Sequence, residues 1–169
     1  QVEDCIKILN NEKKELLDKA MYLLNFETFS DIGGVWGVHG AYTFYLMMKH
    51  KIRKAFLVDK NISKETEETS RGFSQLTLLQ GLCTESWILR KIGMTDLMIL
   101  FDFLLHQAFP SWKKVLSELA SRTNAFAIYN PQWVASDKTV NLLGMKESEY
   151  FSNVPHGREH PSYSNLYPK

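Results

Sequence analysis

Residues 29–40 read FSDIGGVWGVHG, with four glycines within eight residues. It overlaps a short segment, residues 26–32, that carries Phe26, Thr28, Phe29 and Ile32, is too short for a typical helix and runs directly into Gly33 and Gly34. A stretch with helical character, residues 41–50, follows the glycine-rich turn. A strand, a tight turn and a helix in this order predict the first unit of an α/β fold.

The same alternation continues along the chain. Helix-compatible segments separate four further short apolar runs: the predicted strands are residues 55–59, 76–80, 96–102 and 125–129, and the predicted helices are residues 64–74, 86–92 and 112–122. Residues 96–102 form the clearest strand, because a continuous apolar run between two acids suits a central parallel strand covered on both faces. The pattern predicts an open, doubly wound α/β domain with a mostly parallel sheet and helices on both faces.

The length of 169 residues suits a single domain with a substantial core. Residues 1–25 are a helical lead-in, with residues 10–12 as the candidate break between two helices. Residues 26–133 carry the α/β core, and residues 134–169, where no clear period is seen, form a C-terminal extension or part of an acceptor region.

Composition limits the partners. The 20 basic and 19 acidic residues give a net charge of +1, which supplies no broad positive field, so no nucleic-acid partner is expected. No apolar run approaches the roughly 20 residues that span a bilayer, so no membrane partner is expected. Cys5 and Cys83 lie far apart without CxxC spacing, which fits a reducing compartment and predicts a cytoplasmic location.

Two acids frame a candidate ligand site. Asp31 directly precedes the glycine pair and Asp59 ends the second predicted strand, so both lie at the carboxyl ends of strands, where ligands bind in open α/β sheets. The patterns GxGxxG and GxxxxGK[ST] are absent. A carboxylate at Asp31 would repel a phosphate but can pair with the amino group of an amino acid, and Asp59 can accept both hydroxyls of a ribose. The two acids indicate an adenosine-bearing ligand.

The string DIGGVWG at residues 31–37 resembles the first motif of the class I S-adenosylmethionine-dependent methyltransferases, and FLVD at residues 56–59 resembles their second motif. LFDFLLHQ at residues 100–107 looks like the segment after the family's fourth strand. The resemblance covers roughly residues 26–133 and implies an S-adenosylmethionine site. The residues implied to bind this cofactor are Asp31, Gly33, Gly34, Gly37, Asp59, Phe101 and Asp102.

The chain departs from the family pattern at three places. Gln107 stands where a second histidine often occurs, which puts a role at that position in doubt. The third predicted strand is followed by Gln80-Gly81 with no adjacent acid, so Gln80 or a backbone group would have to hold the adenine amino group. Two further strands that often close the sheet are not identified in residues 134–169, so the sheet is expected to end early.

The resemblance implies an enzyme that moves a methyl group from S-adenosylmethionine to a small-molecule O, N or C nucleophile by in-line displacement, with S-adenosylhomocysteine as product. His106 is either a general base, because imidazole titrates near neutral pH, or only a wall of the pocket. Three alternatives stay open. They are a catalytically silent cofactor-binding or scaffold domain, a nicotinamide-dependent oxidoreductase, which the missing GxGxxG disfavours, and decarboxylation or cleavage of the same cofactor.

Three further signals are weaker. NPQW at residues 130–133 is similar to the Asn-Pro-Pro-aromatic string of amino-group methyltransferases, but it follows the predicted fifth strand and has Gln132 at the second proline. His39 could touch a cofactor or start a helix in solvent. His156, Glu159 and His160 resemble a metal cluster, yet Gly157 and nearby prolines argue against the helix that would bring them together, so no metal is expected.

Overall fold

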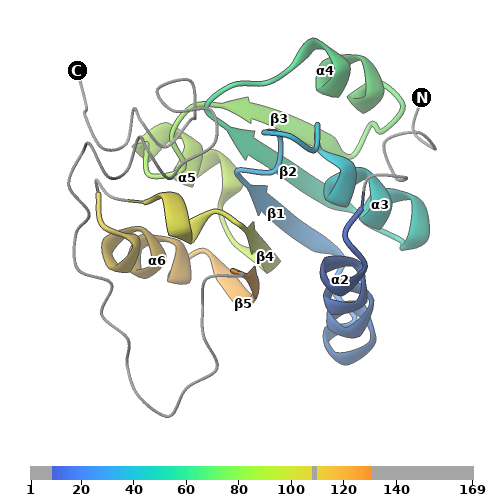
Figure 1. Ribbon diagram of the computed structural model, residues 1–169, viewed down its shortest axis with the longest axis horizontal. Coiled ribbons are helices and arrows are strands. Elements are labelled where there is room, and N and C mark those ends of the chain that lie inside the picture. Colours follow the sequence, from blue (N-terminus) through green and yellow to red (C-terminus); the bar gives the residue numbers. More distant parts are fainter. Residues whose placement is uncertain (1–8, 108–109, 131–169) are drawn as a thin grey trace, which may run out of the picture.

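Figure 1 shows the chain as a computed structural model, which describes residues 9–107 and 110–130. The strands are β1 (Thr28–Ile32), β2 (Lys54–Asp59), β3 (Leu76–Gln80), β4 (Thr95–Phe101) and β5 (Thr123–Tyr129). The helices are α2 (Asn11–Leu24), α3 (Ala41–Lys49), α4 (Lys64–Ser70), α5 (Ser86–Ile92) and α6 (Trp112–Ala120), with a short 3₁₀ turn, η1 (Leu104–His106), after β4. Each predicted strand and each predicted helix between them is present.

The strands form one sheet in the order β3-β2-β1-β4-β5, and every neighbouring pair is parallel. The chain moves outward from β1 to β3 and then crosses back to place β4 on the other side of β1. This reversal creates a crevice at the carboxyl ends of β1 and β4, the position where open α/β sheets bind ligands. The predicted doubly wound α/β fold is confirmed.

Helices cover both faces of the sheet, because the strands carry apolar side chains on both sides. Along β4, Leu97 and Ile99 belong to the core beneath α2 and α3, whereas Met98 and Leu100 belong to the core beneath α5 and α6. All four side chains are fully buried. The prediction that residues 96–102 form a central strand covered on both faces is therefore confirmed.

Element boundaries follow local capping. The side chain of Asn10 accepts a hydrogen bond from the backbone N–H of Lys13 at 3.1 Å, so it caps α2 at the predicted break in the lead-in. The stretch before this cap lies outside the described residues. Most of the predicted bounds that differ do so by one or two residues: β1 begins at Thr28 rather than residue 26, α6 ends at Ala120 rather than residue 122, and β5 begins at Thr123 rather than residue 125. The largest difference is at α4, which ends at Ser70 rather than residue 74. Among residues 9–107 and 110–130, no helix is long and apolar enough to cross a membrane.

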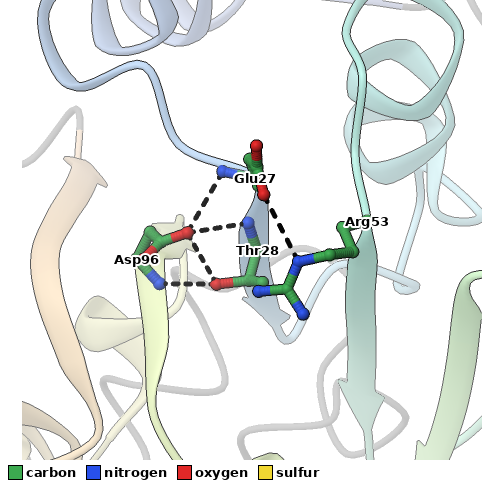
Figure 2. Close-up of polar contacts among 4 residues, drawn as sticks. All are labelled: Glu27, Thr28, Arg53 and Asp96. Atoms are coloured by element: carbon green, nitrogen blue, oxygen red, sulfur yellow. Dashed lines mark hydrogen bonds and ion pairs between the residues drawn. The ribbon is translucent and has the colours of Figure 1, made fainter.

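A polar cluster joins the amino-terminal ends of β1 and β4, at the end of the sheet opposite the crevice (Figure 2). Oδ2 of Asp96 accepts hydrogen bonds from the backbone N–H groups of Glu27 and Thr28 at 3.1 and 2.9 Å, and from the hydroxyl of Thr28 at 2.8 Å. The Thr28 hydroxyl accepts in turn from the backbone N–H of Asp96. Burial raises the pKa of Asp96, but these donors outweigh it and hold the pKa below its ordinary value.

Asp96→Ala is expected to lower the free energy of unfolding by about 2 kcal/mol, because it leaves the donors of Glu27 and Thr28 without their acceptor. Since the folded pKa is depressed, this contribution is present above the ordinary pKa and is lost as the pH falls through the folded value. Urea unfolding at neutral and acid pH measures both effects. Glu27→Gln, which removes only the exposed ion pair with Arg53, is the control and should cost less than about 0.5 kcal/mol. Equal losses in the two variants would contradict the assignment.

Candidate functional site

A cavity of about 370 Å³ lies at the carboxyl ends of the strands. This volume is within the range of about 300–1,000 Å³ that is typical of small-molecule sites. Its walls come from the loop after β1, the ends of β2 and β3, the segment after β4, and helices α2 and α3. The predicted site residues that line it are Asp31, Gly33, Gly34, Asp59, Phe101, Asp102 and His106. Gly37 instead lines a neighbouring cavity together with His39, and Asp59 and Trp36 border both.

The glycine loop is held close to the strand ends. The backbone N–H of Gly33 donates to the carbonyl of Val58 at 2.8 Å, and that of Gly40 donates to the carbonyl of Gly34 at 2.9 Å. Gly33 has φ +76°, a conformation that favours glycine. At Gly34 the reason for glycine is different: a Cβ there would lie 2.5–2.7 Å from the carboxyl atoms of Asp31. The loop can therefore pass over Asp31 only because residue 34 has no side chain.

Asp31 is a buried carboxyl with 2% of its surface exposed. Burial raises the pKa of Asp31 to about 7, and the negative charge of nearby Asp59 adds to this rise. The hydrogen bond from Thr43 and the positive charge of Lys13 act in the opposite direction. The Thr43 hydroxyl donates to Oδ2 of Asp31 at 2.7 Å. A carboxyl in this state is stabilised as an anion by any further positive charge that enters the cavity.

Asp59 ties the end of β2 to the loop after β1. Its Oδ2 accepts the backbone N–H of Val35 at 3.0 Å, and its Oδ1 accepts that of Asn61 at 3.1 Å. Burial raises the pKa of Asp59, and the backbone N–H groups that point at it counter part of that rise. Asp59 also lines the cavity, where its carboxylate is an acceptor within reach of a ligand.

The segment after β4 supplies the opposite wall. Asp102 adopts φ +52°, which is unusual for a residue with a side chain and turns the chain sharply away from the strand. Its Oδ2 forms an ion pair with Nζ of Lys13, and its Oδ1 is buried without a hydrogen-bond donor among the described residues. His106 and Gln107 also line the cavity, and the ring of Phe103 lies against Gly33.

Lys13 is the main site residue that the sequence analysis missed. It projects from α2 into the cavity wall, is only 8% exposed, and places Nζ 5.3 Å from the ring centroids of Tyr42 and Tyr129 and 5.8 Å from that of Phe101. A signal exists in the sequence, because Lys13 falls at helical spacing between Leu9 and Leu17 on the apolar stripe of the lead-in. A lysine on such a stripe needs a partner.

The segment after β3 is the one that the sequence resemblance places beside an adenine. Residues 81–84 line the cavity, whereas Gln80, proposed as one substitute for the missing acid, is exposed and does not. Glu85 follows at the start of α5, where its Oε1 accepts the backbone N–H of Leu82 at 2.7 Å. The wall after β3 therefore presents mainly backbone and small side chains to the cavity.

Several predicted features lie outside the described residues. Of the NPQW string only Asn130 is described, and His156, Glu159 and His160 all fall in the undescribed part. Across residues 9–107 and 110–130, no three histidine, cysteine or acidic side chains are grouped so that they could hold a metal ion. His39, at φ +49°, contacts Ser63 through Nδ1 at 3.0 Å.

No family model and no curated protein matches the chain. Solved structures do. A putative O-methyltransferase from Nostoc punctiforme PCC 73102 matches with a TM-score of 0.54 and 18% identity over 67% of this chain and 33% of that chain. The N-terminal domain of EvdMO1, solved in the presence of SAH and D-fucose, matches with a TM-score of 0.60 and 14% identity over 81% of this chain and 57% of that chain. The same domain with SAH bound gives 0.58 and 15% over 78% of this chain and 54% of that chain.

The likeness shows that the chain has the fold of these structures, which is the class I methyltransferase-like α/β fold. The chain spans only about a third to just over half of the length of these solved structures.

Proposed function

We propose that this chain binds S-adenosylmethionine in the cavity at the carboxyl ends of its strands and transfers the methyl group to a small-molecule O, N or C nucleophile. The observation that carries the proposal is the convergence of Asp31, Asp59 and Asp102 on one cavity at the crevice between β1 and β4. These acids come from the ends of three different strands. The solved neighbour with SAH bound has the same fold.

Each end of the cofactor has a suitable partner. Asp59 ends β2 at the cavity, where its carboxylate accepts the ribose hydroxyls. Asp31 pairs with the amino group of the methionine portion, and the loop at Gly33 and Gly34 lets this portion lie close to the backbone. Residues 81–84 border the adenine.

The bound cofactor supplies an electrophilic methyl group on a positively charged sulfur, and the sulfur keeps the electron pair when the new bond forms. The cavity wall at Phe101 and His106 holds the acceptor in line with that methyl group, because positioning supplies most of the acceleration in such a displacement. His106 lies where an imidazole can take the proton that the acceptor loses. The net charge of +1 favours a small acceptor over a nucleic acid.

Calorimetry with S-adenosylmethionine and S-adenosylhomocysteine tests the proposal. The wild-type chain is expected to bind both, and Asp59→Asn is expected to bind each about tenfold more weakly, because the amide accepts the ribose hydroxyls less strongly. Glu67→Gln, an exposed acid on α4, is the matched control and should leave both affinities unchanged.

A folded wild-type chain that binds neither ligand would contradict the proposal, and NADH would be tried next. Release of S-adenosylhomocysteine with a panel of small-molecule acceptors then separates an enzyme from a catalytically silent cofactor-binding domain. Loss of S-adenosylmethionine without an acceptor would reveal cleavage or decarboxylation instead.

A further inference from the structure

Lys13 is a charged side chain in a place where a lysine is unusual. It is nearly buried in the wall of the cavity, paired with Asp102 and surrounded by the rings of Tyr42, Phe101 and Tyr129. A lysine that only anchored α2 could form its ion pair at the surface, as Lys64 does with Glu68. Burial of the ammonium at the cavity instead costs solvation that a ligand could help to restore.

The charges in the cavity separate into two sides. Residues Lys13, Lys60 and His106 are the described lining residues that can carry positive charge. Lys60 directly follows Asp59 and therefore lies at the ribose side. Nζ of Lys13 lies over the ring of Tyr42, and the next residue, Thr43, donates its hydroxyl to Asp31, so Lys13 and Asp31 line neighbouring parts of the cavity. Lys13 is thus on the side where the amino-acid portion of the ligand is placed.

We infer that the ammonium of Lys13 binds the α-carboxylate of the methionine portion, which makes the site selective for cofactors that carry this carboxylate. The inference rests on the proposed function. The ammonium of Lys13 has three donors and Asp102 takes one, so further donors can reach a ligand carboxylate. Asp31 and the donor-free Oδ1 of Asp102 provide acceptors for the neighbouring amino group. The ion pair on the protein therefore matches the two opposite charges of an amino acid.

The arrangement also links the lead-in helix to the ligand. Besides Lys13, helix α2 contributes Glu12, which accepts a hydrogen bond from the hydroxyl of Tyr129, and its cap residue Asn10 donates its backbone N–H to the hydroxyl of the cavity-lining Tyr42 at 3.1 Å. Selectivity for the carboxylate is thus supplied by an element outside the glycine loop and the strand ends.

The test compares two ligands that differ only in this carboxylate: S-adenosylhomocysteine and its decarboxylated analogue, S-adenosyl-3-thiopropylamine. The wild-type chain is expected to prefer S-adenosylhomocysteine by about tenfold, the effect of one charge-assisted contact. In Lys13→Met this preference is expected to disappear, because binding of S-adenosylhomocysteine weakens while binding of the analogue is unchanged. Lys14→Met is the matched control, since Lys14 lies on the same helix over the ring of Tyr45 and does not line the cavity; it should keep the preference.

A purely structural role would weaken both ligands alike in Lys13→Met, and that result, or an unchanged preference, overturns the inference. The double variant Lys13→Met/Asp102→Asn removes both charges of the ion pair and leaves neither charge without its partner, so it keeps the test valid if the single variant folds poorly. The double variant is also expected to lose the preference, and retention would overturn the inference. A wild-type chain that binds both ligands equally overturns it while leaving the proposed function intact. A wild-type chain that binds neither overturns the proposed function itself.

Discussion

Asp31→Asn is expected to bind S-adenosylhomocysteine at least about a hundredfold more weakly than the wild type, because it removes the buried negative charge that faces the ligand's amino group. Above about pH 7 the same variant is expected to be more stable without ligand. The amide can still accept the hydrogen bond from Thr43, so the geometry beneath the glycine loop is retained.

The sign of the stability effect follows from the raised pKa of about 7 at Asp31. A carboxyl that holds its proton more tightly when folded destabilises the protein as the pH rises from the ordinary value through the folded value. Asparagine carries no such penalty. The expected gain is on the order of 2–4 kcal/mol above about pH 7, and it should vanish below about pH 4.

Urea unfolding and calorimetry across this pH range measure both halves of the prediction. In the wild type, affinity should rise between about pH 6 and pH 8 as Asp31 ionises, whereas Asp31→Asn should show no such rise. Thr43→Val removes a hydrogen bond that lowers the pKa of Asp31 and should move the wild-type profile to higher pH. If Asp31→Asn bound S-adenosylhomocysteine as well as the wild type does, Asp31 would not face the ligand.

Gly34→Ala is the second large expected effect. Its new Cβ would lie 2.5–2.7 Å from the carboxyl of Asp31, and that side chain is buried and held by Thr43, so it cannot swing aside cheaply. Either Asp31 or the loop must shift, which should lower affinity for S-adenosylhomocysteine about a hundredfold and cost about 1–3 kcal/mol of stability.

Gly72→Ala is the matched control, because Gly72 does not adopt a positive φ and its added Cβ would meet only the carbonyl of Thr69 at an ordinary 3.6 Å. It should change neither affinity nor stability by a measurable amount. Normal ligand binding by Gly34→Ala would contradict this prediction, because it would mean that the loop can accommodate a Cβ beside the carboxyl of Asp31.

Much of the architecture was predictable because it depends on local patterns. Continuous apolar runs mark parallel strands covered on both faces, as in residues 96–102, and the segments between them mark the helices. The boundaries of α4 and β5 were less accurate, since the ends of elements depend on turns and neighbouring strands as well as on sequence.

The candidate site was predictable where it follows one strand end or one turn. Asp31, Gly33 and Gly34 share one segment, and the strand pattern alone places Asp59 and Asp102 at the same edge of the sheet. Gly37 belongs to the same segment, yet it lines the neighbouring cavity, because the loop turns between Gly34 and Gly40. Whether it touches a cofactor stays a prediction.

The order of strands and helices along the chain, the glycine-rich turn after β1 and the acids at the strand ends could all be read from the amino-acid sequence, because each is a property of a short segment. The three-dimensional arrangement was needed to show that Lys13 pairs with Asp102 at the cavity wall, that Asp31 is buried deeply enough to raise its pKa, and that Asp59 holds the loop at Val35. These features depend on distances and solvent exclusion between segments far apart in the chain, which a pattern along one segment does not record.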